Sequence, residues 1–118
     1  MGYNKVGNKK KEIQMAEKTY AGVTVTVNDE GYFEDHTQWT KEMALEIAKE
    51  MDIELTDEHN KIIDFLRTDY EEKGGIPTMR RIKKVGGVPT KDFYQLFPDG
   101  PLKKSCKVAG LPKPASCV

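Results

Sequence analysis

TDEHNKIIDFLRTDYEEKGG, residues 56–75, has the clearest helical pattern in the chain. Its large apolar side chains recur at helical spacing: Ile62, Ile63, Leu66 and Tyr70. Thr56 is placed to cap the N-terminus, and Asp57 and Glu58 follow in the first turn, where they complement the helix dipole. Gly74-Gly75 ends the run. The pattern predicts the central core helix, against which the rest of the chain must pack.

An upstream segment, residues 18–33, alternates with a period of two. Its residues divide between two faces: Val23, Val25 and Val27 on one, Thr24 and Thr26 on the other. This alternation predicts a half-buried strand. Turn residues lie on both sides of it, Ala21-Gly22 before and residues 28–31 after, so we expect a small hairpin or meander. Because two or three short strands are marginally stable alone, this unit must pack on helices.

A shorter helix is predicted between the hairpin and the central helix, from Thr40 to about Met51. Thr40 can cap its N-terminus, and Trp39 would pack near its start. The expected buried stripe consists of Met43, Ile47, Ala48 and Met51. Apolar residues at three- and four-residue intervals are typical of an amphipathic helix.

Two further helices are predicted after the central one. Pro77 is suited to position N1 of the first, which Gly86-Gly87 would end, and Pro89-Thr90 opens the second. The apolar residues expected to face inward are Met79, Ile82, Phe93, Leu96 and Phe97. Residues 98–101, Pro-Asp-Gly-Pro, form a strong turn. Residues 103–109 could add one or two final helical turns.

We therefore expect a mainly α (α+β) fold, with a small N-terminal β-hairpin packed on a helical bundle. Residues 77–97 would form a helix-turn-helix-like pair in that bundle. The expected organisation is a disordered leader or cloning extension at residues 1–14, a helical domain at 15–105 and a mobile, redox-active C-terminal arm at 106–118. A chain of 118 residues can bury one modest core.

Charge and hydropathy exclude several classes of protein. The chain has 19 basic and 19 acidic residues, which argues against a nucleic-acid binder driven by bulk charge. No apolar run approaches the roughly 18 residues of a membrane span, and the lysine-rich leader lacks the apolar region of a signal peptide. We therefore expect a cytoplasmic protein whose cysteines are reduced at rest.

Both cysteines of the chain lie in its C-terminal segment, CKVAGLPKPASCV. Two prolines stiffen the segment, and Gly110 could act as a pivot. An extended arm over residues 111–117 would span roughly 20 Å, enough to enter a cleft in another protein. If the arm folds back, Cys117 could reach Cys106, and a disulfide between them would contribute roughly 3 kcal/mol.

Reactivity of the Cys117 thiol depends on the fraction present as thiolate. Nearby charges in the sequence have opposite effects on this fraction. The α-carboxylate of Val118 opposes ionisation. Four lysines favour it: Lys103, Lys104, Lys107 and Lys113. The densest basic run in the body comprises Arg80, Arg81, Lys83 and Lys84. We expect this run, or a basic surface on a partner, to help lower the Cys117 pKa.

Other chemistries are weaker alternatives. A zinc site would need His36, His59 and the cysteines, but no CxxC or HxxxH spacing is present, so we expect no metal. The helix pair could bring Thr90, Lys91 and Gln95 to DNA, as in a redox-sensing regulator. Because only one of these three is basic, nucleic acid is not the expected partner. A small interaction domain with an incidental disulfide is the remaining alternative.

The tail pattern CxxAGLPKPxxCV closely resembles the DsrC/TusE family of sulfur-carrier proteins. Other segments agree: Met15-Ala16, DEGYF at 29–33, DEHNKIIDFLRTDY at 57–70, Gly75-Ile76-Pro77 with Arg80, and YQLFP at 94–98 with Gly100-Pro101. The resemblance runs from about residue 15 to the end of the chain, and the tail motif is its most specific part. One departure is Ala115-Ser116, where related tails often have Thr-Gly.

The resemblance implies that Cys117 bears sulfur and that Cys106 is the resolving thiol. TusE-like members act in tRNA thiolation relays and generally keep only the penultimate cysteine. The presence of Cys106 therefore places this chain nearer DsrC, the gamma subunit of dissimilatory sulfite reductase. In that branch the partners are the alpha and beta subunits of sulfite reductase. The arm inserts into this enzyme near its siroheme and leaves with sulfur held between the two cysteines as a trisulfide.

The resemblance also implies a covalent carrier and co-substrate rather than an enzyme. It would have no cofactor of its own, because the siroheme and iron–sulfur clusters belong to the partner. A membrane-linked thiol-disulfide reductase would regenerate the thiols, or sulfurtransferases would load persulfide in the opposite direction. Arg80 matches a family arginine that could lower the Cys117 pKa or steady an anionic sulfur species. Arg81 is a weaker candidate, and Lys104 and Lys113 are further supporting or partner-binding candidates.

Overall fold

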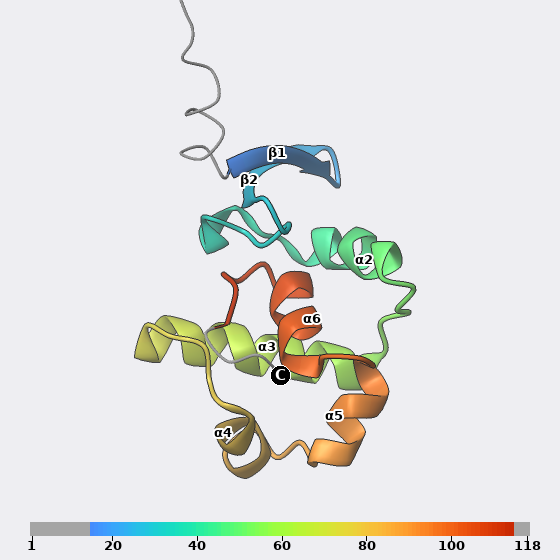
Figure 1. Cartoon of the computed structure of the whole chain (residues 1–118), viewed down its shortest axis with the longest axis vertical. Coiled ribbons are helices and arrows are strands. Elements are labelled where there is room, and N and C mark those ends of the chain that lie inside the picture. The colour runs from blue at the N-terminus through green and yellow to red at the C-terminus, as the bar shows by residue number, and fades with distance from the viewer. Residues whose placement is uncertain (1–14, 115–118) are drawn as a thin grey trace, which may run out of the picture.

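The structure, a computed structural model, describes residues 15–114 (Figure 1). Within them the chain forms a two-stranded hairpin, a short 3-10 helix and five α-helices, so the predicted mainly α fold with a small β element is confirmed. The predicted leader, residues 1–14, and the tip of the arm, residues 115–118 with Cys117, lie outside the described residues.

The hairpin pairs β1 (Met15–Tyr20) with β2 (Val23–Asn28) in antiparallel register. Its two turn residues, Ala21 and Gly22, have φ values of 52° and 78°. Positive φ at both central positions is the requirement of a type I′ turn, whose twist matches that of the strands it joins. The Ala21-Gly22 turn therefore sets the register of the predicted hairpin.

The buried face of β2 differs in part from the expected one. Val25 and Val27 are buried as predicted, but Val23 is 46% exposed because it lies beside the turn. A bridge between Val27 and Phe33 extends the hairpin into a short meander. The 3-10 helix η1 (His36–Gln38) then leads the chain to the first α-helix.

The two helices with the strongest sequence patterns form as predicted, each directly after its capping threonine. α2 (Lys41–Glu50) buries Met43, Ala44, Ile47 and Ala48. Met51 caps its C-terminus and is half-buried. α3 (Asp57–Lys73) buries Ile62, Ile63 and Leu66, while Tyr70 is half-buried. It ends at Gly74, whose φ of 77° is the left-handed conformation that a glycine C-cap supplies.

α4 (Met79–Lys84) begins later than the sequence predicted. Pro77 was expected at N1, but Thr78 is the N-cap, and its hydroxyl accepts a hydrogen bond from the Arg81 backbone N–H at 3.1 Å. This bond satisfies one of the unpaired donors of the first turn. The prediction of Pro77 at N1 was therefore wrong, and the proline is buried just before the helix.

The last two helices complete the core. α5 (Thr90–Leu96) begins where predicted, with Phe93 and Phe97 buried and Leu96 half-buried. α6 (Pro101–Val108) starts two residues earlier than residue 103, the expected start. Proline fits the first helical position because the N–H it lacks would have no partner there.

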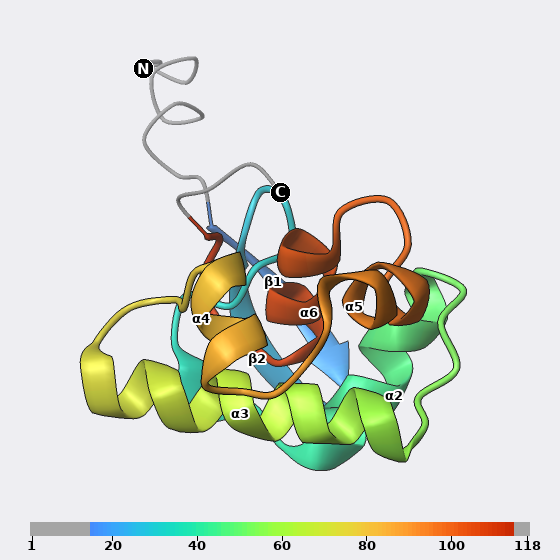
Figure 2. The same cartoon turned by 90° about the horizontal axis from the view of Figure 1, so that it is seen from below.

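α6 occupies the centre of the helical arrangement. It lies between α2 and α3 and also contacts α5 (Figures 1 and 2). Its buried residues are Pro101, Leu102, Ser105, Cys106 and Val108. The helix that carries Cys106 is therefore enclosed by three others. Within residues 15–114, no helix is long and apolar enough to cross a membrane.

Candidate functional site

Cys106 lies in the last turns of α6 and is 0% exposed. Burial raises the pKa of its thiol to about 12. The thiolate is the nucleophilic form of cysteine, and it is scarce at neutral pH when the pKa is this high. In this arrangement Cys106 is a protonated core residue rather than an attacking thiol.

Tyr32 is the ionisable neighbour of Cys106. Its pKa is raised to about 12, mainly by burial and further by the negative charge that an ionised Cys106 would carry. The Lys107 ammonium lies 5.0 Å from the centroid of the Tyr32 ring, and burial lowers the pKa of this lysine. Burial thus disfavours the charged form of all three groups, which is consistent with a neutral Cys106 thiol.

Stability should fall in alkali because of Cys106 and Tyr32. Folded, both groups keep their protons up to about pH 12, whereas their ordinary pKa values are 9.0 and 10.0. Above pH 9 the unfolded state therefore binds fewer protons, so this stabilisation is complete below pH 9 and is lost as the pH rises towards 12. Between about pH 8 and about pH 10.5, the raised pKa of Cys106 alone should lower the free energy of unfolding by about 2 kcal/mol.

Urea unfolding at these two pH values measures the effect. Cys106→Ala removes the buried thiol, so its free energy of unfolding should fall by about 2 kcal/mol less over this interval than that of the parent protein. The lysines and the other tyrosines titrate in both proteins and cancel in the comparison. An identical pH dependence in the two proteins would contradict the raised pKa of Cys106.

The arm leaves α6 through a Schellman motif, a hydrogen-bonded helix end with a left-handed residue. Gly110 adopts a φ of 70°, and its N–H donates to the Lys107 carbonyl at 3.2 Å. The Leu111 N–H donates to the Cys106 carbonyl at 3.0 Å. We call residues 106–111 the arm root. Because Leu111 is bonded to the backbone of Cys106, the buried thiol and the start of the arm belong to one structural unit.

Two side chains from distant elements bind the arm root. The indole Nε1–H of Trp39 donates to the Val108 carbonyl at 2.9 Å, and Nη1 of Arg67 donates to the Ala109 carbonyl at 2.8 Å. Nη2 of Arg67 also donates to the His36 carbonyl at 3.1 Å. Sequence analysis assigned Trp39 to the packing of α2 and missed Arg67. The sequence feature that could have indicated its role is its position on α3 next to Leu66, at the edge of the buried apolar stripe.

The described part of the arm lies against the body of the protein. Leu111 and Pro114 are buried, and Pro112 is half-buried. Lys113, a predicted supporting residue, forms an ion pair with Glu30 in the turn after β2, with Nζ 2.9 Å from Oε1. This contact lowers the pKa of the Glu30 carboxyl. Because both side chains are largely exposed, their pairing adds little stability.

The predicted basic run has two parts with different surroundings. Arg81 is paired with Asp69, which is only 4% exposed, through Nε at 3.0 Å and Nη2 at 2.7 Å from Oδ1. Arg80 faces solvent, as do the two lysines that end α4. Lys104 is half-buried on α6. An anion or partner can therefore approach Arg80 directly, whereas the Arg81 guanidinium already neutralises a buried carboxylate.

The histidines make contacts within the fold. His59 joins the start of α3 to the end of α5: its Nδ1 accepts from the Thr56 N–H at 3.0 Å, and its Nε2 lies 2.9 Å from the Leu96 carbonyl oxygen. His36 packs edge-on against Tyr70, with ring centroids 5.1 Å apart. Within the described residues, no three His, Cys, Asp or Glu side chains form a group that could hold a metal ion.

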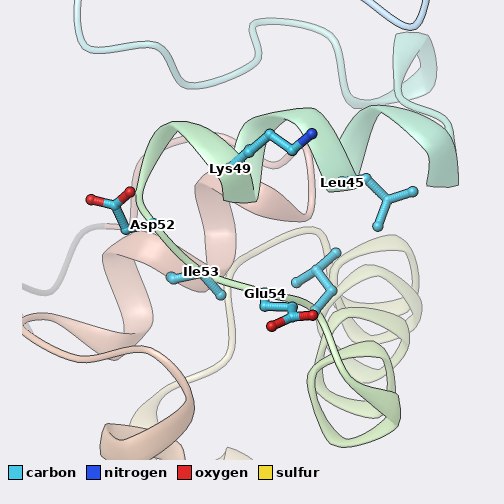
Figure 3. Close-up of a pocket in the computed structure, with 6 residues that line it drawn as sticks. Leu45, Lys49, Asp52, Ile53 and Glu54 are labelled. Atoms are coloured by element: carbon cyan, nitrogen blue, oxygen red, sulfur yellow. The ribbon is translucent and has the colours of Figure 1, made fainter.

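A shallow groove of about 610 Å³ lies on the solvent side of α2 and its linker to α3 (Figure 3). It is lined by Leu45, Lys49, Asp52, Ile53, Glu54 and Leu55. Leu45, which is 58% exposed, projects from the face of α2 opposite its buried stripe. Among residues 15–114, neither Cys106 nor any of the predicted basic residues lines this groove, so it is separate from the arm root.

Fold and arm together define a small helical domain with one thiol in its central helix and a second cysteine in the tail. The family described as "DsrC like protein" matches residues 19–118. The sulfite reductase, dissimilatory-type subunit gamma, of Nitratidesulfovibrio vulgaris is 42% identical over 106 residues, which are 88% of this chain and 100% of the relative. Sulfurtransferase TusE of Salmonella paratyphi A is 35% identical over 84% of this chain and 97% of its own.

A solved structure agrees with these sequence relatives. The NMR structure of Allochromatium vinosum DsrC has a TM-score of 0.74 and 39% sequence identity, and the match covers 88% of this chain and 99% of that one. This chain belongs to the DsrC-like family, the DsrC/TusE sulfur-carrier proteins. The resemblance inferred from the tail motif is thereby confirmed.

Proposed function

We propose that this chain is a sulfur carrier of dissimilatory sulfur metabolism, in which Cys117 accepts sulfur and Cys106 resolves it. The observation that carries the proposal is the hydrogen bond between Leu111, at the start of the arm that ends in Cys117, and the Cys106 carbonyl. One thiol is held in the core, and the other is at the far end of the same short segment. This separation suits a carrier that collects sulfur with one thiol and resolves it with the other.

Loading requires only the Cys117 thiol. Its thiolate attacks the outer sulfur of a donor persulfide, the donor S–S bond breaks, and Cys117 persulfide forms as the donor thiolate leaves. The Cys106 thiolate can then attack the Cys117 sulfur of this persulfide. That step forms the Cys106–Cys117 disulfide and releases hydrosulfide, so atoms and electrons balance without an additional oxidant.

At a sulfite reductase the same thiols would form a trisulfide. The two thiols lose two electrons and two protons, and the electrons reduce a sulfur intermediate on the partner enzyme from the +2 level to the zero-valent central atom. In either route Cys106 must leave its buried, protonated state before it reacts. Burial therefore delays the second step until the arm root opens, which protects a loaded Cys117 from premature attack.

The proposed partners are the alpha and beta subunits of a dissimilatory sulfite reductase. The identity of 42% with a gamma subunit supports this choice. A membrane-linked thiol-disulfide reductase or sulfurtransferases would act on the same thiols. Exposed Arg80 is the foremost candidate to contact an acidic partner surface or an anionic sulfur species. In this scheme the carrier has no cofactor of its own, and the siroheme and iron–sulfur clusters stay on the partner.

Mass spectrometry after incubation with glutathione persulfide tests the assignment of Cys117. The parent protein should gain the mass of one sulfur atom on the tail peptide. Cys117→Ala should abolish this adduct, because it removes the attacking thiol, whereas Cys106→Ala should retain it and prolong its lifetime. An adduct that survives Cys117→Ala and disappears in Cys106→Ala would overturn the assignment.

A persulfide relay for tRNA thiolation is the second candidate, because a TusE relative aligns with 84% of this chain. A relay passes persulfide onward without a resolving thiol. Cys106→Ala should therefore leave the rate of persulfide transfer to a sulfurtransferase acceptor unchanged. Use as a sulfite reductase co-substrate should be lost in the same variant, so the two acceptors distinguish the candidates.

A further inference from the structure

The C-terminal end of α6 has a partner for each of its last carbonyls. The final carbonyls of a helix have no partner within it. Two of these accept hydrogen bonds from the backbone of the arm root itself, and the next two, at Val108 and Ala109, accept from Trp39 and Arg67. Trp39 follows η1, and Arg67 lies in α3. The start of the arm is therefore tied to two elements that are distant in sequence.

Trp39 and Arg67 also hold each other in place. Cζ of Arg67 lies 4.2 Å from the centroid of the Trp39 ring, a cation–π distance. The second bond of the guanidinium, to the His36 carbonyl, fixes its plane. Burial lowers the pKa of Arg67, yet a guanidinium remains protonated at neutral pH. Its bond to Ala109 is thus a partly desolvated, charge-assisted hydrogen bond.

Gly110 is in direct contact with Trp39. A Cβ at Gly110 would overlap Cδ1 and Cγ of the indole and lie 2.6 Å from the Trp39 Cβ. The backbone and the ring meet without space for a methyl group. The pivot that sequence analysis expected at Gly110 is therefore a packed position in this structure, and the first arm residue beyond the hydrogen-bonded root is Pro112.

We propose that Trp39 and Arg67 are positioning residues for sulfur transfer, which fix the arm root and so set the point, just after Leu111, from which the arm starts. This inference rests on the proposed role of Cys117 as the carrier thiol. When a partner draws the arm from the body, the tether to Cys117 is residues 112–117 if the root stays fixed and residues 107–117 if the root is released. The root thus limits both the length of the tether and its starting direction.

Tether length sets the concentration of the thiol at a docked acceptor. Effective concentration falls roughly as the −3/2 power of tether length, so lengthening from six to eleven residues dilutes Cys117 roughly 2.5-fold. A tether without a fixed starting direction also loses the orientation needed to enter a narrow cleft. Release of the root should therefore affect delivery to a protein acceptor more than reaction with a small persulfide.

Distance measurement between two spin labels tests the fixed root directly. The full chain would carry one label on Cys117 and one on α3 at Lys61→Cys, with Cys106→Ser in every variant so that only these sites react. Trp39→Phe keeps the ring but loses the Nε1–H donor, and Arg67→Met loses both guanidinium bonds. Each should widen the distance distribution about 1.4-fold, because the spread of a flexible tether grows as the square root of its length. Arg67→Lys, which can restore one bond, should give an intermediate width.

Matched controls separate positioning from general destabilisation. Tyr94→Phe alters an exposed aromatic ring far from the arm root in sequence, so it should not change the distribution. Ile82→Ala weakens the core on α4 without touching the arm root and should lower the urea midpoint alone. Trp39 and Arg67 variants that behave like Ile82→Ala, with lower stability and unchanged distance widths, would overturn the inference.

Loading with glutathione persulfide keeps the inference distinct from the proposed function. For this measurement Cys117 is unlabelled, and its loading should stay within about twofold of the parent in all variants, because a small donor needs no directed arm. Failure of the parent itself to load would overturn the proposed function, while the distance distributions would still report on the root. Selective loss of small-donor loading in the Trp39 and Arg67 variants would show an effect on thiol chemistry and would contradict a positioning role.

Discussion

Gly110→Ala is expected to lower the free energy of unfolding by about 2–5 kcal/mol. The φ of 70° at this position costs a residue with a side chain about 1–2 kcal/mol. The added methyl group must also displace Trp39, which it would overlap, and overpacking of this kind costs about 1–3 kcal/mol. Displacing the indole further weakens its bond to the Val108 carbonyl. Urea unfolding of the purified variant measures the loss.

Gly87→Ala is the matched control. Gly87 has the same φ of 70°, but nothing lies within 4 Å of the place where its Cβ would be. This variant therefore reports the conformational cost alone, about 1–2 kcal/mol. The difference between the two variants isolates the contact with Trp39. Equal losses would mean that the indole moves away without cost, contrary to a fixed arm root.

The fold follows from local signals to a large extent. The valines of β2, the Ala21-Gly22 turn and the capping threonines of α2 and α3 each act over a few residues, so the sequence alone could place these elements. The predicted start of α4 was wrong because two local preferences compete there, proline at N1 and threonine at the N-cap. The hydrogen bond from the Arg81 N–H to the Thr78 hydroxyl decides in favour of the threonine. The outcome depends on three-dimensional hydrogen-bond geometry, which the spacing of apolar residues in the sequence does not specify.

The surroundings of the thiols depend on contacts between distant parts of the chain. The tail motif identified Cys106 and Cys117 as chemically important, but it could not show that α6 lies between α2 and α3 and buries Cys106. Nor could it show which side chains bind the arm root. The partners of Trp39 and Arg67 are backbone carbonyls, whose residue type gives no sign of the bond. A carbonyl acceptor leaves no pattern in a single sequence.

Leu111→Ala is expected to make Cys106 reactive. Leu111 is 0% exposed, and its N–H is bonded to the Cys106 carbonyl. In a Schellman motif the residue at this position usually packs on the one that Cys106 occupies, so truncation should loosen the cover over the thiol. Removal of a buried leucine side chain costs about 2–5 kcal/mol. If half of such a loss appears as easier local opening, alkylation of Cys106 should accelerate about 5-fold to 60-fold.

Cys106 alkylation by iodoacetamide should be followed in a Cys117→Ser background, so that only the buried thiol is counted. Ile82→Ala removes a similar volume from α4, and it is the control for opening by global unfolding. Reactivity that merely follows global stability would rise equally in both variants once their free energies of unfolding are matched with urea. A larger acceleration in Leu111→Ala identifies local opening of the arm root as the route that exposes Cys106. Under the proposed function, Cys106 would be exposed by the same route only when the arm root opens after loading, so release of the root would start the resolving step.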